Sequence, residues 1–165
     1  MFERLNTPQD VFNWRLGAAL TMERTLVDML GETADKAQDG AIRQMLLEHQ
    51  AETRGHVSNI EEAFGLFGWD VDDSPCPAIQ GIEREGKSTI RKADDSVVDE
   101  VILAGAAEAE HHEIAVYRNL IANARAMGRE DVAEILQRNL GQDEIARDKV
   151  ERAAEQVAAT APGAA

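Results

Sequence analysis

Hydrophobic residues recur at spacings of three and four positions along four long stretches of the chain. This spacing is typical of helices that bury one face, and no stretch alternates as a half-buried strand would. Thr7 and Pro8 form a capped start for the first helix, and Gly68 and Gly128 end the second and the third. We expect the four helices near residues 7–36, 41–67, 93–128 and 130–157.

A shorter amphipathic segment lies between the second and third long helices, at residues 76–92. We expect a brief helix there, weakened by two glycines, that crosses from one end of a bundle to the other. The buried stripe of the third long helix is predicted to begin at Val97. The chain is therefore predicted to be all-α, an antiparallel four-helix bundle made of two hairpins joined by a long crossover. The predicted bundle domain covers residues 1–158, and a flexible C-terminal tail covers residues 159–165.

The chain has 165 residues, of which 44% are hydrophobic and 29% charged, so we expect one globular domain. Seventeen Lys and Arg residues oppose 31 Asp and Glu residues, giving a formal net charge of −14. This charge disfavours nucleic acid and anionic membranes as partners and attracts cations. No apolar run approaches a membrane span and no signal-peptide pattern is present, so a cytoplasmic location is expected. A single cysteine, Cys76, excludes an internal disulfide.

Acidic side chains fall inside the hydrophobic stripes of the first and fourth helices, where charged residues are uncommon. Glu23 lies three residues after Leu20 on the first helix, and Asp143 lies three residues after Leu140 on the fourth. The neighbouring Glu144 is turned towards the edge of its stripe. Asp143 is therefore the carboxylate that we expect the fourth helix to bury.

The second and third helices carry polar residues on their apolar faces in the same way. His49 and His56 are centred in the stripe of the second helix, and Glu52 lies on its flank between them. Glu113 is centred in the stripe of the third helix, and Glu110 lies on the flank one turn earlier. Every long helix therefore contributes a carboxylate to the predicted core.

A carboxylate removed from water without a partner is strongly disfavoured, and the basic residues of this chain mostly fall beside the stripes. Cations from outside are the simpler source of compensation, because two divalent ions balance four carboxylates. Oxygen and imidazole donors suit iron or manganese, and we expect two iron ions, with manganese as the alternative. The predicted ligands are Glu23, Glu52, Asp143 and one or both of Glu110 and Glu113, with His49, His56 or both as nitrogen donors.

Each of these residues taken alone has an ordinary structural alternative. Glu23 would suit a boundary residue or an ion pair, and His49 or His56 would suit a hydrogen-bonded position in the core. The coincidence of such residues on all four long helices favours the metal site.

Other polar residues of the third helix receive different predictions. Glu108 and His111 have the spacing of a helical ligand pair but face away from the apolar stripe. His112 is expected to support a metal-binding carboxylate rather than to bind the metal. Tyr117 either hydrogen-bonds such a carboxylate or packs in the core.

Four segments of the chain carry a resemblance to a known family. They are Ala19-Leu20-Thr21-Met22-Glu23-Arg24, His49-Gln50-Ala51-Glu52-Thr53-Arg54-Gly55-His56-Val57, Cys76-Pro77-Ala78-Ile79 and Glu110-His111-His112-Glu113-Ile114-Ala115-Val116-Tyr117. On these segments the chain resembles the YciE/YciF stress-protein family over nearly its whole length. The resemblance implies a ferritin-like four-helix bundle with a dinuclear metal site, commonly dimeric and tied to bacterial stress responses.

Glu110 and Glu113 are also similar to the paired carboxylates on the third bundle helix of rubrerythrins, which implies Fe(II) oxidation or peroxide reduction. Gly55 and Ala146 stand where rubrerythrins carry histidines, and the chain has no rubredoxin-like cysteine cluster.

We therefore expect a di-iron carboxylate protein that oxidises Fe(II) or reduces peroxide or oxygen at the centre of the bundle. The alternatives are a non-catalytic metal-binding or dimerisation module and a metal-free bundle that acts through its surface. The expected partners are metal ions, peroxide or oxygen and a second copy of the chain, with no nucleic acid and no membrane.

Overall fold

Five helices make up the computed structural model, which describes residues 4–160. They are α1 (Pro8–Ala34), α2 (Gly40–Phe67), α3 (Pro77–Ile90), α4 (Val98–Ala126) and α5 (Glu130–Thr160). The described residues contain no strand, which confirms the all-α prediction. None of the helices has the length and apolar character that a bilayer span requires.

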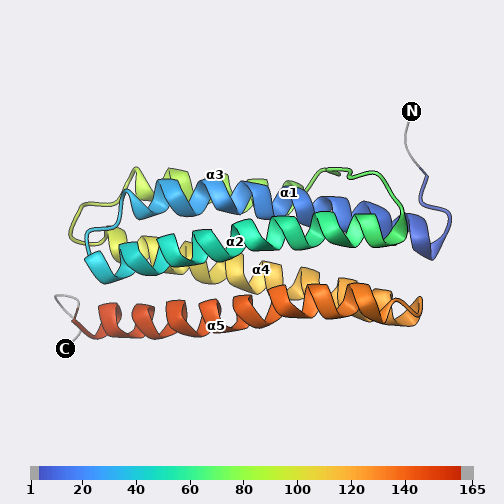
Figure 1. The fold of residues 1–165 in the computed structure, drawn as a ribbon. Helices are drawn as coiled ribbons and strands as arrows, with labels where there is room; N and C mark the ends of the chain where they lie inside the picture. Colours follow the sequence, from blue (N-terminus) through green and yellow to red (C-terminus); the bar gives the residue numbers. More distant parts are fainter. Residues whose placement is uncertain (1–3, 161–165) are drawn as a thin grey trace.

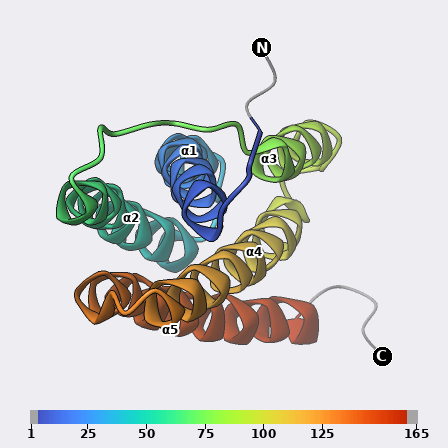
Figure 2. The ribbon, with the colours of Figure 1, turned by 90° about the vertical axis from the view of Figure 1, so that its right-hand side faces the viewer.

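The four long helices run alongside one another in an elongated bundle (Figure 1). Helices α1 and α2 form one antiparallel hairpin, and α4 and α5 form the other. The connection after α2 crosses over α1 before it enters α3, which packs against α1 and α4 (Figure 2). This arrangement confirms the predicted ferritin-like bundle with a crossover helix.

Local sequence chemistry fixes where the first hairpin starts and ends. The Thr7 hydroxyl accepts a hydrogen bond from the Asp10 amide at 3.1 Å, and the Asp10 carboxylate accepts one from the Thr7 amide at 2.9 Å. This capping box satisfies amides that the first helical turn leaves unpaired. Asp39 caps α2 in a similar way, and Gly68 ends it with a φ of 69°, a left-handed conformation that glycine adopts at little cost.

Helix α4 starts later than the sequence pattern predicts, and Val97 is exposed rather than buried. The Asp94 carboxylate accepts hydrogen bonds from the Ser96 amide at 3.0 Å and the Ser96 hydroxyl at 2.8 Å. Such local side-chain bonds compete with helical backbone pairing, so residues before Val98 form a turn. The prediction that Val97 begins the buried stripe was wrong, and Val98 takes that place.

Helix α5 continues through Thr160, so the first two residues of the predicted tail are helical. The other five residues of that prediction, 161–165, lie outside the described residues.

The hydrophobic core is divided into two clusters along the bundle. One contains Leu20 and Leu26 of α1 with Phe64 and Leu136, and the other contains Leu30 with residues of α2, α4 and α5. On α2 the buried His49 and His56 lie in the sequence between members of the two clusters, and on α5 the buried Asp143 does so too. The fold therefore places a polar layer across the middle of an otherwise apolar core.

Candidate metal centre

Six buried polar side chains from all four long helices meet in this polar layer. Two overlapping groups have ligand atoms within 4.8 Å of one another. The first group is Glu23, His56, Glu113 and Asp143, and the second is His49, Glu110, Glu113 and Asp143. Glu113 and Asp143 belong to both groups, so they lie between two potential ion positions.

Helical spacing explains how each helix places its donors in the layer. His49 and His56 are separated by two turns of α2 and face inward together, because seven residues complete nearly two helical turns. Glu110 and Glu113 are three residues apart on α4, and both are buried. The layer therefore contains both of the glutamates between which the sequence leaves the choice of ligand open.

Within the described residues, no lysine or arginine forms an ion pair with the carboxylates of this layer. Seven buried side-chain atoms have no hydrogen-bond partner: Glu23 Oε2, His56 Nδ1, Glu110 Oε2, both Glu113 carboxylate oxygens and both Asp143 carboxylate oxygens. The ion pairs within the described residues join these carboxylates only to histidines, and none to lysine or arginine. Buried polar atoms are nearly always satisfied in proteins, and a set of seven in one place could hold a cation.

The two histidines face different carboxylates. His49 Nε2 lies 2.9 Å from a Glu110 oxygen. His56 Nδ1 lies 3.4 Å from Glu23 and 3.5 Å from Asp143. Each histidine therefore points one ring nitrogen at the carboxylates and is held through its other nitrogen by a further side chain.

These further side chains are Gln142 and Glu52. Gln142 Oε1 lies 3.0 Å from His56 Nε2, and Glu52 Oε2 lies 3.3 Å from His49 Nδ1. Such partners orient a ring for metal binding and decide which nitrogen carries the proton. The structure thus leaves Glu52 out of both ligand groups and places it, partly exposed, on the outer side of His49.

Burial and mutual repulsion keep protons in the layer when no metal is bound. Burial, followed by the charges of Asp143 and Glu23, raises the pKa of Glu113 well above its usual value. Burial and the Glu23 charge likewise raise the pKa of Asp143. Burial alone would lower the pKa of His49, but the Glu110 carboxylate raises it to about 9. The layer therefore approaches neutrality by binding protons, which a metal would replace.

A line of hydrogen-bond donors ends on the Glu23 carboxylate. Asn59 donates to Asn139 Oδ1 at 2.6 Å, and Asn139 donates to the Tyr117 hydroxyl at 2.9 Å. The Tyr117 hydroxyl donates to Glu23 Oε1. Burial and the nearby Glu23 and Asp143 charges raise the pKa of Tyr117 well above its usual value, so the phenol keeps the proton that it donates. Of the two roles left open for Tyr117, the structure has the hydrogen bond to a carboxylate.

The remaining polar residues of α4 lie away from this layer. Glu108 is exposed, and His111 pairs at the surface with Glu151 at 3.0 Å, as their facing predicts. His112 does not support a carboxylate: its Nε2 lies 3.9 Å from the Cys76 sulfur. Burial and the positive charge of Arg15 lower the pKa of His112, so the neutral ring suits this thiol contact.

Asn139 and Gln142 are site residues that the sequence reasoning did not find. Asn139 is four residues before Asp143 on the same face of α5, and it is fully buried. A search for amides as well as charged residues within the stripe would have located it. Gln142 lies beside the stripe, and only its contact with His56 reveals its role.

Comparisons with known proteins show what the chain is similar to. A family model described as "Domain of unknown function (DUF892)" matches residues 7–161. Protein YciF of Escherichia coli strain K12 is 26% identical over 141 residues, which cover 84% of this chain and 85% of the relative.

Solved structures of similar proteins have the same fold. YcfI from Rhodopseudomonas palustris has a TM-score of 0.89 at 29% identity, covering 92% of this chain and 97% of that one. The E. coli stress protein YciF has a TM-score of 0.89 at 23% identity, covering 94% and 99% of the two chains. A protein from Xanthomonas campestris pv. campestris has a TM-score of 0.73 at 19% identity, covering 92% and 93%. The resemblance to the YciE/YciF family is confirmed.

Proposed function

The chain belongs to the DUF892 family, and we propose that its buried polar layer holds two iron ions that react with peroxide or oxygen during stress. The cluster of seven buried atoms without hydrogen-bond partners carries this proposal, because burying such a cluster in an apolar core without a cation is energetically unfavourable.

The arrangement of donors favours two ions rather than one. Glu113 and Asp143 are common to both groups, and none of their four carboxylate oxygens has a hydrogen-bond partner in the described residues. Glu23 and His56 complete one set of donors, and Glu110 with His49 completes the other, on α1, α2 and α4. Four carboxylates also balance the charge of two divalent ions.

The chemistry of the donors favours iron, with manganese as the alternative. Both groups combine carboxylate oxygens with one imidazole, a set typical of iron and manganese sites. A structural zinc site would more often include thiolates, and Cys76 contacts His112 instead of the layer.

Two bound Fe(II) ions would supply the two electrons that convert one peroxide and two protons to two water molecules. The protein's own part is to hold the donors in place and to keep bulk water away. Tyr117 fixes one oxygen of Glu23, Gln142 fixes the ring of His56, and we propose that Glu52 fixes the ring of His49. The completely buried positions of Glu113 and Asp143 limit exchange with solvent.

Metal analysis and a peroxide reaction test the proposal together. Protein purified after iron-replete expression should contain about two ions per chain, because the chain has two overlapping groups of donors. Anaerobic addition of peroxide to the Fe(II) form should change its absorbance rapidly and consume one peroxide per two Fe(II). Absence of bound metal would contradict the site, and bound metal without a reaction would contradict the catalytic role.

A pair of variants tests which residues bind the metal. Asp143→Asn removes a charge that both ion positions share, so we expect it to abolish binding of at least one ion. Glu108→Gln makes a comparable change on the exposed side of α4 and should leave the metal content unchanged. Loss of metal in both variants, or in the Glu108 variant alone, would contradict the assignment.

The burial of the layer also favours a second function, a structural metal site that locks the two hairpins together. Glu23, His56, Glu113 and Asp143 have no exposed surface, which suits a closed site. Metal would then raise the melting temperature strongly without any reaction with peroxide or oxygen. The homodimer and the cytoplasmic location stay predictions, and sedimentation and cell fractionation would check them.

A further inference from the structure

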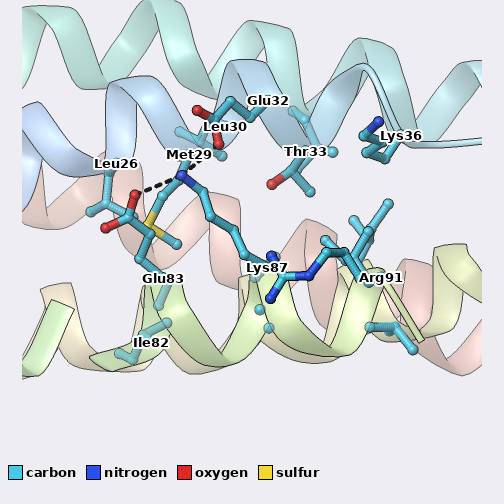
Figure 3. Close-up of a pocket in the computed structure, with 18 residues that line it drawn as sticks. Leu26, Met29, Leu30, Glu32, Thr33, Lys36, Ile82, Glu83, Lys87 and Arg91 are labelled. Carbon is cyan, nitrogen blue, oxygen red and sulfur yellow. Dashed lines mark hydrogen bonds and ion pairs between the residues drawn. The ribbon is translucent and has the colours of Figure 1, made fainter. Parts of the chain in front are cut away.

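We propose that a pocket between α1, α3 and α4 binds a medium-chain aliphatic carboxylate, with the chain inside the pocket and the head group at its basic mouth. The pocket is an opening of about 330 Å³, and none of the six donors of the polar layer lines it. Figure 3 shows its lining. This inference goes beyond the proposed function and does not rest on it.

The walls of the pocket are mostly aliphatic. They include Leu26, Leu30, Leu46, Ile82 and Ile102. Water inside such walls lacks hydrogen-bond partners, so an apolar chain that replaces it gains free energy. A volume of this size lies at the lower end of the range for small-molecule sites, which suits one unbranched chain.

Two glycines keep the pocket open. Gly86 of α3 and Gly105 of α4 both line it, and a Cβ at either position would meet no atom within 4 Å. Glycine lowers the stability of a helix interior relative to alanine, and no close packing requires it at these two places. The vacant volume in front of both glycines is therefore available to a ligand.

The charges at the mouth favour an anionic head group. Five charged residues line the pocket, and three of them are basic: Lys36, Lys87 and Arg91 against Glu32 and Glu83. Lys87 reaches from α3 to Glu32 of α1 at 2.8 Å and also contacts Glu83 at 2.9 Å (Figure 3). Both acidic residues are thus paired with Lys87.

Lys36 and Arg91 form no ion pair within the part of the chain that the structure describes. On a chain with a net charge of −14, this local excess of positive charge selects a carboxylate over a cationic head group.

The length of the pocket agrees with a medium chain. Along α1 the lining runs from Leu26 to Thr33, a distance of roughly 10 Å at the helical rise, and Lys36 extends it just beyond the end of the helix. The acyl chain of decanoate can lie within that span with its carboxylate near Lys36 and Arg91. The pocket thus matches one amphipathic molecule in volume, polarity and charge.

Calorimetric titration with decanoate tests this site directly. We expect saturable binding of one decanoate per chain, and octanoate should bind about tenfold more weakly because it buries two fewer methylene groups. Decyltrimethylammonium, which has the same chain and the opposite charge, should bind much more weakly than decanoate. No saturable binding of decanoate, or equal binding of the cationic probe, would overturn the proposal.

Matched variants separate the pocket from other surfaces. Gly105→Leu fills the pocket from α4 and Gly86→Leu fills it from α3, and both should abolish decanoate binding. Gly65→Leu adds the same side chain at an exposed position on α2, where it also meets no atom, and should bind as the native chain does. Circular dichroism would confirm that each variant is folded.

Arg91→Gln should weaken decanoate binding several-fold while leaving the binding of neutral 1-decanol unchanged. Unaltered decanoate binding by both pocket-filling variants would overturn the site. A dimer that these two variants dissociate, without decanoate binding to the native chain, would assign the pocket to a second copy of the chain and would also overturn it.

Discussion

Asn139 and Tyr117 show how uncharged residues determine the properties of a charged centre. Their hydrogen bonds run in one direction, from Asn59 through both residues to Glu23. The line leaves Glu23 with one oxygen fixed and the other, Oε2, without a hydrogen-bond partner. A carboxylate held in this way is ready to bind an ion without first losing rotational freedom.

Replacement of Tyr117 by phenylalanine tests that role. Tyr117→Phe would leave Glu23 Oε1 and the Asn139 amide without this partner in a buried place. We expect a loss of about 1–3 kcal/mol in the free energy of unfolding and about tenfold weaker metal binding. Urea denaturation and metal titration would measure the two effects.

Arg118→Gln on the next residue is the control, because it breaks only an exposed ion pair with Glu144. It should change the free energy of unfolding by less than about 1 kcal/mol. Equal effects of the two variants would show that the buried hydroxyl has no special role.

The facing of single residues was the part of the site that the sequence predicted best. Glu23, His56 and Asp143 are buried where their spacing from leucines and isoleucines places them. Glu52 shows the limit of this reasoning, because a flank position has access both to the core and to the surface. Its distance from the other donors depends on how far α2 stands from α4 and α5, which helical periodicity does not contain.

Among the elements, the crossover after α2 lies very close to α1. A Cβ on Gly17 of α1 would lie 2.8 Å from the Ser74 hydroxyl and 2.9 Å from the backbone of Asp72 and Ser74. The Thr21 hydroxyl also donates to the Ser74 carbonyl at 2.8 Å. Contacts with α1 therefore hold the crossover in place over the first hairpin.

Gly17→Ala should separate the crossover from α1. Because two of the three nearest atoms belong to the backbone, we expect a net destabilisation of about 1–3 kcal/mol, despite the better helix propensity of alanine. Gly65→Ala on α2, where a Cβ meets open space, should instead stabilise the protein by up to about 1 kcal/mol. Thermal unfolding of both variants would check the opposite signs.

Element boundaries were predictable where a cap or a glycine marks them. The Thr7 side chain caps the start of α1, and the backbone conformation of Gly68 ends α2. Both properties act locally, whatever surrounds the residue. The start of α4 has no such marker, because Val97 makes no side-chain capping bond. The hydrophobic pattern continues through this region, so it did not indicate the turn that Asp94 and Ser96 form.

For the molecule as a whole, the polar layer couples folding to pH when metal is absent. His49 has its pKa raised from 6.5 to about 9, and Asp143 has its pKa raised from 3.8. Between about pH 4 and pH 9 the folded chain therefore binds more protons than the unfolded chain does. Stability must then fall as pH rises, because the stabilising proton on His49 is lost and the buried acids are forced to ionise.

We expect the metal-free protein to be less stable at pH 8.5 than at pH 6. Each proton that the folded state holds in excess contributes about 1.4 kcal/mol per pH unit to this fall. Urea midpoints measured in the presence of a chelator would show it. Bound metal replaces the protons, so the metal-loaded protein should lose much less stability over the same range.

Asp143→Asn provides the control for this pH dependence, because it removes one of the buried acids. Its metal-free form should show a shallower fall than the native chain. A flat profile for the chelated native chain would mean that the layer is hydrated and its acids are ionised in the folded state.

The donors of the layer are divided equally between the two hairpins, with Glu23, His49 and His56 on one and Glu110, Glu113 and Asp143 on the other. Sliding one hairpin along the other by a single residue moves three donors by about 1.5 Å, whereas bound metals tolerate deviations of only about 0.2 Å. Leucine and isoleucine contacts between the two hairpins tolerate such a shift far more readily than metal coordination does. Two metal ions bound in this layer would therefore fix the axial alignment of one hairpin relative to the other.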